Sequence, residues 1–299
     1  SIQISKLFYE RFMNEEEITL ISPHMAPGLY DAFGTEEFDD LYLKYEADKT
    51  IPKKTVPAQS LFFDLLKERA ETGRIYIMNL DHCNSHSSFK DKVSMSNLCQ
   101  EITLPTTPIQ DIHDDQGEIA LCILSAVNVG GLNDLSELEN ICDLSVRALE
   151  QIIDYQDYPV KAAEVSTKKR RSLGIGYIGL AHYLAKNGVK YSDPKAWDLV
   201  DRLSEAFQYN LLRASCNIAM EKGKCEGFER TKYADGLLPI DHYKKDVDKI
   251  VPHKQRMAWE SLRKDIAKHG LRHSTLSAQM PSESSSVVSN ETNGIEPPR

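Results

Sequence analysis

The sequence is poor in cysteine and has no long apolar run. Its 299 residues include six cysteines, at positions 83, 99, 122, 142, 216 and 225. Because so sparse a set is no disulfide framework, we expect a reducing, cytoplasmic setting, where paired cysteines serve catalysis or bind metal. No apolar stretch approaches the roughly 18–20 residues that span a bilayer, so we predict no membrane partner.

The sequence also lacks an excess of positive charge. Lys and Arg total 36 and Asp and Glu total 45, which gives a net charge of −9. A general binder of nucleic acid needs a basic face, so we predict no nucleic-acid partner. There is no initiator Met, and the chain stops at NGIEPPR directly after a strongly patterned segment. We therefore expect a fragment of a longer protein.

Short apolar runs alternate with helical patterns, which predicts an α/β fold with mostly parallel strands. Strands are expected at residues 73–78, 96–105, 118–129 and 273–280, the third one apolar enough to be buried on both faces. Helices are expected from a capping-box-like start at 134–137, over 194–222, and over 256–270 up to Gly270. No repeat or linker divides the chain, so we assign residues 1–299 to a single domain.

The glycines of Gly174–Gly179 match the dinucleotide-binding pattern GxGxxG. That site needs a hydrophobic strand before the first glycine, whereas Lys168–Arg171 precede it here and fit a loop. We interpret the motif as a strand and a turn in which glycines permit close packing.

Residues Asp81–His86 (DHCNSH) gather types of side chain that bind metals. A structural zinc site uses four ligands, usually in two spaced pairs, and the sequence has no second cluster. We therefore predict a polar loop with internal hydrogen bonds and no metal.

The stretch SNLCQEITLP, residues 96–105, places one thiol between an amide and a carboxylate. In an extended segment Asn97, Cys99 and Glu101 project from the same face. No Lys, Arg or His lies nearby to favour a thiolate, and the carboxylate disfavours one. A neutral thiol beside a carboxylate base suits hydrogen-atom transfer, in which a sulfur radical takes hydrogen from carbon. An ordinary strand cysteine is the alternative.

The stretch PSESSS, residues 281–286, follows an apolar run and precedes a helical pattern. Small hydroxyl side chains at a helix start can bind an anion such as phosphate. They are also favoured there as simple helix caps. The residues alone leave both interpretations open.

Several motifs together resemble the large, catalytic subunit of class I ribonucleotide reductase. They are Asn97-Leu98-Cys99-x-Glu101, Cys122 within ALCxLSAxNxG 23 positions further on, PSESSS and NGIEPPR. The resemblance extends over nearly the whole chain. It implies a ten-stranded α/β barrel of two five-stranded parallel halves, with the radical cysteine on a central finger loop.

The resemblance also implies roles for particular residues. Cys99 would carry the thiyl radical, Glu101 would take the proton of the 3′-hydroxyl, and Asn97 would hydrogen-bond the substrate hydroxyls. Cys122 would be one of two redox cysteines, its partner lying outside this chain. The residues implied for holding the substrate diphosphate are Pro281, Ser282, Glu283, Ser284 and Ser285.

The implied activity is reduction of ribonucleoside diphosphates to deoxyribonucleoside diphosphates for DNA synthesis. The implied partners are a small (beta) subunit whose diiron-tyrosyl site supplies the radical, thioredoxin or glutaredoxin as reductant, and an upstream polypeptide that completes the barrel. The resemblance places ATP and dNTP effectors outside this segment, implies no metal or cofactor within it, and implies that it is inactive alone. An adenosylcobalamin-dependent reductase, a non-catalytic half-barrel of a split reductase and, more weakly, a glycyl-radical enzyme remain alternatives.

Overall fold

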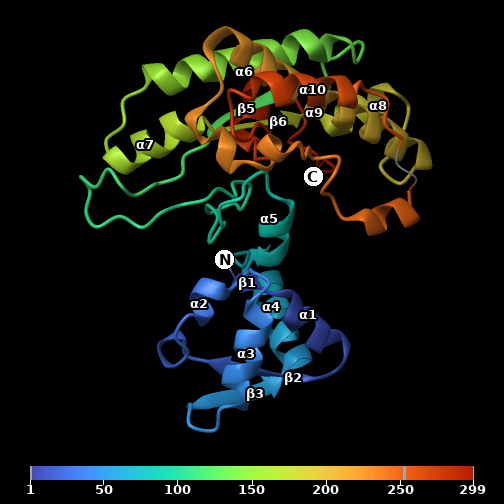
Figure 1. Ribbon diagram of the computed structural model, residues 1–299. Coiled ribbons are helices and arrows are strands. Elements are labelled where there is room, and N and C mark those ends of the chain that lie inside the picture. Colours follow the sequence, from blue (N-terminus) through green and yellow to red (C-terminus); the bar gives the residue numbers. More distant parts are fainter. Residues whose placement is uncertain (1, 252–253, 299) are drawn as a thin grey trace. The chain divides into compact units, whose positions relative to one another are not determined.

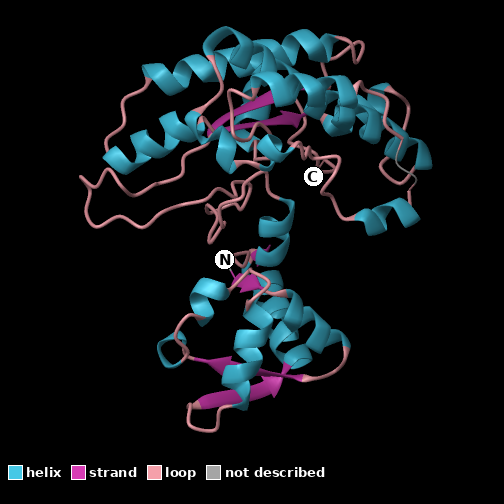
Figure 2. Ribbon diagram, viewed as in Figure 1, coloured by secondary structure: helices cyan, strands magenta, loops and turns pink. Residues whose placement is uncertain are grey.

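The computed structural model describes residues 2–251 and 254–298 (Figure 1). The chain forms two compact units. The first consists of Ser1–Ser87 and Lys92–Thr103, and the second consists of Ser88–Asp91 and Leu104–Arg299. Helices and strands occur in both units (Figure 2), as the predicted α/β class requires. The assignment of all 299 residues to one domain stays a prediction.

The first unit contains two small sheets. β1 (Ile2–Ile4) pairs in parallel with β4 (Ile77–Asn79), and β2 (Glu17–Ile21) pairs antiparallel with β3 (Lys53–Pro57). Its helices are α1 (Lys6–Met13), α2 (Leu29–Ala32), α3 (Phe38–Ala47), α4 (Ala58–Thr72) and α5 (Leu80–His86), with a 3-10 turn at Pro23–Met25. The core includes Tyr42, whose buried hydroxyl donates to the carbonyl of Thr19 and accepts from its N–H, each at 2.7 Å. This pair of bonds fixes α3 against β2.

The second unit is built around two parallel strands, β5 (Ile123–Asn128) and β6 (Leu173–Ile178), with Leu124 opposite Gly174. Its helices are α6 (Glu137–Tyr155), α7 (Lys161–Arg170), α8 (Leu180–Lys186), α9 (Pro194–Lys222), α10 (Trp259–His269) and α11 (Glu283–Val288). Three 3-10 turns lie at Glu226–Arg230, Lys232–Asp235 and Lys245–Lys249. β6 is buried over all of its residues except the partly exposed Tyr177, as expected for a strand covered on both faces.

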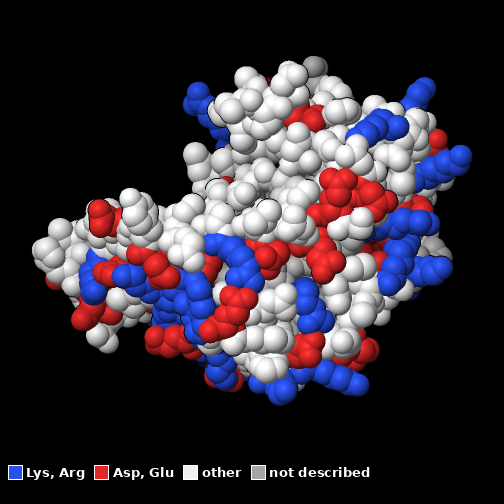
Figure 3. Space-filling model, turned by 90° about the horizontal axis from the view of Figure 1, so that it is seen from above, with Lys and Arg blue, Asp and Glu red and all other residues white. Residues whose placement is uncertain are grey.

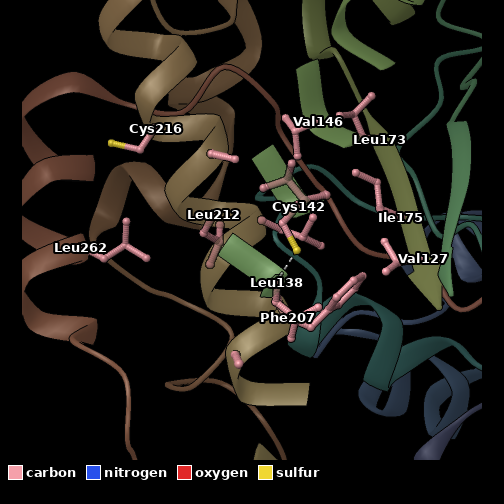
Figure 4. Close-up of a cluster of buried hydrophobic side chains, with 14 of the residues drawn as sticks. Val127, Leu138, Cys142, Val146, Leu173, Ile175, Phe207, Leu212, Cys216 and Leu262 are labelled. Carbon is pink, nitrogen blue, oxygen red and sulfur yellow. Dashed lines mark hydrogen bonds between the residues drawn. The ribbon is translucent and has the colours of Figure 1, made fainter. Parts of the chain in front are cut away.

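The core of the second unit lies between α6, α9 and β6 (Figure 4). Leu138 and Cys142 of α6 face Leu212 and Phe207 of α9, and all four are buried. Burial raises the pKa of Cys142 to about 12, so this thiol stays protonated and acts as a small apolar side chain.

The long helices of the second unit were predicted well. α9 spans the predicted range, and α10 lies within its predicted range and ends before Gly270. The predicted start of α6 is confirmed only in part, because the helix begins at Glu137 and its N-cap Ser136 makes no side-chain cap hydrogen bond. The Glu137 carboxylate does accept the backbone N–H of Asp134 at 3.1 Å. That contact is the reciprocal half of a capping box.

Several strand predictions were wrong. The strand predicted at 73–78 begins only at Ile77, and no strand forms over 96–105. The run 118–129 contributes a strand only from Ile123, and Leu124 is 41% exposed rather than buried. β5 has just one strand neighbour among the described residues, which leaves part of its surface uncovered.

Three further assignments are corrected by the structure. Residues 168–170 belong to helix α7 rather than to a loop, and residues 81–86 belong to α5 rather than to a polar loop. Residues 273–280 form no full strand, although they run along β6 through a parallel bridge between Ile175 and Ser277.

The closed ten-stranded barrel is not seen: the described residues form three two-stranded sheets.

A buried cluster of charges around Glu150 joins three segments of the second unit. Its carboxylate accepts hydrogen bonds from Arg171 at 2.7 Å, from Arg272 at 2.8 Å and from His273 at 3.0 Å. Burial alone would raise the pKa of Glu150, but the bonds from His273, Arg171 and Arg272 outweigh it and lower the pKa to about 2. Arg171 lies just before β6, and the other two partners lie at the start of the segment beside it, so the cluster fixes both relative to α6.

We expect Glu150→Gln to lower the free energy of unfolding by about 3–5 kcal/mol, because it leaves buried cations without their counter-charge. Because the folded-state pKa is depressed, the stability due to this carboxylate is complete above about pH 4.5 and is lost as the pH falls towards 2. Urea unfolding at several pH values measures both effects. The variant should lack this part of the acid loss. Glu164→Gln, which removes a carboxylate paired with Lys161 and Lys168, is the control and should change stability much less. Equal losses in the two variants would contradict the account.

Candidate active site

The segment around Cys99 is a turn and not the extended strand predicted from the sequence. Gln100 has a left-handed backbone, with a φ of 64°, and its N–H donates to the Asn97 carbonyl at 3.3 Å. The Asn97 side chain closes the turn, because its Oδ1 accepts the N–H of Ile102 at 3.1 Å. A bend at this point cancels the alternation of faces on which the sequence argument depended.

The turn nevertheless holds the three predicted groups within five residues of chain. Cys99 is half-buried at the bend, beside Leu98, which is 82% exposed. Glu101 is half-buried, and its Oε2 is shielded from solvent without a hydrogen-bond partner among the described residues. An unpaired buried carboxylate oxygen is costly, so this atom is suited to accept a proton or hydrogen bond from a ligand.

Cys122 lies one residue before β5 in the second unit, and it is half-buried rather than enclosed as predicted. Its thiol lies against Gly174 of β6. A Cβ built on Gly174 would come within 2.6 Å of the Cys122 Sγ. None of the six cysteines, all of which lie in the described residues, forms a disulfide.

The serine segment begins α11, a helix of only six residues. Ser282 is buried and donates its hydroxyl to Asn293 Oδ1 at 3.2 Å, while its carbonyl accepts the N–H of Ser286 at 2.8 Å. Glu283, Ser284 and Ser285 are exposed. Ser282 therefore fixes the segment. Glu283 and Ser284 present exposed side chains, whereas the Ser285 hydroxyl donates back to the Ser282 carbonyl at 3.3 Å and Ser286 is buried.

The sequence analysis missed a carboxylate that holds the far end of this segment. Glu291 accepts a hydrogen bond from His182 Nδ1 at 2.9 Å and one from the N–H of Thr292 at 2.8 Å. Burial raises its pKa, but the contacts with His182 and Thr292 outweigh burial and lower it. The Glu291 side chain occupies space that two glycines leave open. A Cβ on Gly130 would lie 2.5 Å from Glu291 Oε2, and a Cβ on Gly179 would lie 2.8 Å from Glu291 Cγ. Only those glycines gave a hint in the sequence.

The GxGxxG motif has the structural role that we predicted for it. Gly174 and Gly176 lie in β6, and a Cβ on Gly176 would come within 2.5 Å of the Ala278 carbonyl oxygen. Gly179 follows the strand with a φ of 84° and begins α8. The glycines thus allow residues 275–278 to run directly against β6.

The predicted site residues fall into two groups by unit. Asn97, Cys99 and Glu101 share the turn in the first unit. Cys122 and the residues of the serine segment belong to the second unit; the latter are Pro281, Ser282, Glu283, Ser284 and Ser285. In that unit Gly174 lies against both Cys122 and Ala278, and Ala278 comes three residues before the serine segment.

The structure shows neither a metal cluster nor a membrane helix in the residues it describes. No group of three or more His, Cys, Asp or Glu side chains within 2–251 and 254–298 could hold a metal ion. Over the same ranges, no helix has the length and apolar character to cross a bilayer. On the face in view in Figure 3, Lys and Arg side chains are mixed with Asp and Glu side chains.

Comparison with known proteins places the chain in a family. The family model described as "Ribonucleotide reductase, barrel domain" matches residues 1–299. The chain therefore belongs to the barrel-domain family of ribonucleotide reductases, as its motifs predicted.

Relatives with curated names agree with this family. The chain is 58% identical to the ribonucleoside-diphosphate reductase subunit alpha of Haemophilus influenzae over 303 residues, which covers 100% of the chain and 40% of that protein. It is 55% identical to ribonucleoside-diphosphate reductase 1 subunit alpha of Escherichia coli and 43% identical to the subunit alpha of Enterobacteria phage T4, again covering 100% of the chain and 40% of each relative. The chain thus spans about 40% of the length of these relatives.

Proposed function

We propose that this chain is the catalytic segment of a class I ribonucleoside-diphosphate reductase, which converts ribonucleoside diphosphates to deoxyribonucleoside diphosphates. One observation carries the proposal: the turn at 97–101 holds a half-buried thiol between an amide and a carboxylate with a shielded, unpartnered oxygen. The family match and the alpha-subunit names of the relatives support it.

In the proposed reaction Cys99 acts as a sulfur radical. It takes the hydrogen atom from the 3′ carbon of the ribose, so that an S–H bond forms as a C–H bond breaks. Glu101 accepts the proton of the 3′-hydroxyl through the oxygen that has no partner in the chain. Asn97 uses its Oδ1 to close the turn, and we assign its amide Nδ2 donors to the substrate hydroxyls.

The reduction itself requires two thiols. The 2′-hydroxyl leaves as water, the 2′ carbon gains hydrogen, and two thiols give up two electrons and two protons as they become a disulfide. Cys122 is one of these thiols in our proposal, and its partner lies outside this chain. The 3′ hydrogen then returns from Cys99 to the substrate, which regenerates the sulfur radical.

The serine segment is the proposed site for the substrate diphosphate. The exposed Ser284 can donate a hydroxyl hydrogen bond to the diphosphate. The Ser285 hydroxyl donates to the Ser282 carbonyl at 3.3 Å, a long bond that we propose it exchanges for one to the substrate. The buried Ser282 fixes the backbone that carries both serines. Pro281 and Glu283 complete the motif. We base this assignment on the hydroxyl donors rather than on a helix dipole, because α11 has only six residues.

The same proposal includes partners beyond the chain. A small (beta) subunit with a diiron-tyrosyl site would supply the radical, and thioredoxin or glutaredoxin would reduce the disulfide. Strands from an upstream polypeptide would complete the ten-stranded barrel, ATP and dNTP effectors would bind outside this segment, and the enzyme would work in the cytoplasm.

We expect Cys99→Ser to abolish reduction in the intact reductase while substrate still binds. Serine keeps the size and polarity of the side chain, but its O–H bond is too strong for oxygen to serve as the radical carrier. Turnover and nucleoside diphosphate binding measure the two effects separately. Cys83→Ser, which changes a half-buried cysteine of the same unit, should keep its turnover. Substantial reduction by Cys99→Ser would refute the radical assignment.

Replacement of both Ser284 and Ser285 by Ala should weaken substrate binding more than it slows the chemistry. Each lost hydrogen bond to a charged group costs roughly 1.5–3 kcal/mol, so KM should rise about tenfold or more with kcat little changed. Ser289→Ala is the matched control, because that hydroxyl donates to the Ser285 carbonyl within the helix. An unchanged KM in the double variant would mean that the serines only cap α11.

A further inference from the structure

Gly174 of β6 and Cys122, the residue before β5, lie next to each other. A Cβ added to Gly174 would lie 2.6 Å from Cys122 Sγ, 2.6 Å from Leu124 Cδ2 and 3.1 Å from the Cβ of Ala278. Real Cβ atoms are essentially never found within 3.0 Å of such neighbours. The thiol thus fills a gap that exists because residue 174 has no side chain.

The backbone does not explain this glycine. Gly174 lies inside strand β6 and is not among the glycines with positive φ. An L-residue can adopt its conformation without strain, so the requirement for glycine is one of space.

The three neighbours differ in how they can respond to a methyl group at position 174. Leu124 is 41% exposed, so its flexible end can rotate away towards solvent. The Ala278 Cβ has no torsion of its own, and its segment is held to β6 by the hydrogen bond from Ala278 N–H to the Ile175 carbonyl. The Cys122 thiol has a single side-chain torsion and must turn to another rotamer.

We propose that Gly174 is a positioning residue for the redox thiol of Cys122. Gly174 touches no reacting atom of the substrate. It sets the rotamer of the Cys122 side chain, which does react. This inference rests on the proposed function, in which Cys122 and a second cysteine are oxidised to a disulfide as the 2′ carbon is reduced.

That chemistry tolerates little displacement of the sulfur. A disulfide requires an S–S distance of about 2.0 Å and a narrow range of torsions. The same sulfur must also reach the substrate before it reaches its partner. A change of rotamer at Cys122 moves the sulfur by more than either step allows, so disulfide formation should fail even where substrate still binds.

Two other glycines serve as controls because their surroundings differ. Gly176 would collide with the backbone oxygen of Ala278, so Gly176→Ala should destabilise the sheet without any specific link to Cys122. Gly131 has ordinary room, with its nearest neighbour at 3.6 Å. Gly131→Ala should change neither stability nor thiol chemistry appreciably.

The redox arm of the test uses the intact reductase. Gly174→Ala should lower the yield of turnover-linked disulfide at Cys122, and kcat with it, by about tenfold or more, while KM changes less than about twofold. Peptide mapping after one turnover measures the disulfide. A wild-type disulfide yield in Gly174→Ala would overturn the proposal.

The structural arm also uses the intact reductase, and it does not depend on turnover. Gly174→Ala should destabilise the chain in urea, and adding Cys122→Ala should restore part of the loss, because removal of Sγ opens room for the new methyl group. The stability changes caused by Gly176→Ala and by Cys122→Ala should instead be additive. Additive effects at 174 and 122 would refute the positioning role. If Gly174→Ala and Cys122→Ala prove coupled in urea but the wild-type reductase forms no disulfide at Cys122, the contact between the two residues stands and the redox role of Cys122 is rejected.

Discussion

The arrangement of the second unit depends on one buried carboxylate. Glu150 is 1% exposed. It binds Arg171 just before β6, and it binds Arg272 and His273 at the start of the segment that runs beside β6. From these anchors the chain continues along β6 to Ala278 and then to the serines. The position of the serine segment and the packing around Cys122 therefore both follow from this one cluster of buried charges.

The sequence predicted best where a single periodic signal determines the structure. α9 has its predicted bounds because helical periodicity, a Pro at its start and a Gly after its end agree. The spacing of Cys99, Glu101 and Cys122 and the serine motif were likewise visible in the sequence, and they sufficed to predict the family. Such features are local and need no knowledge of what packs against them.

The sequence failed where tertiary contacts, or one local side-chain hydrogen bond, decide the structure. The alternating run at 96–105 became a turn because the Asn97 side chain accepts the Ile102 N–H and Gln100 takes a left-handed backbone. The carboxylate socket of Glu291 depends on two glycines, Gly130 and Gly179, that are distant from it in the chain. Neither the Glu150 cluster nor the gap at Gly174 has a sequence pattern, because each joins segments more than 20 residues apart.

The central claim is that the thiol at position 99 removes the 3′ hydrogen of a ribonucleotide. The most direct measurement is the rate of reduction by the intact reductase with substrate deuterated at the 3′ carbon. A C–D bond breaks more slowly than a C–H bond, so the account predicts slower reduction of the deuterated substrate under conditions where hydrogen transfer limits the rate. An identical rate under those conditions, in an enzyme that depends on Cys99, would contradict it.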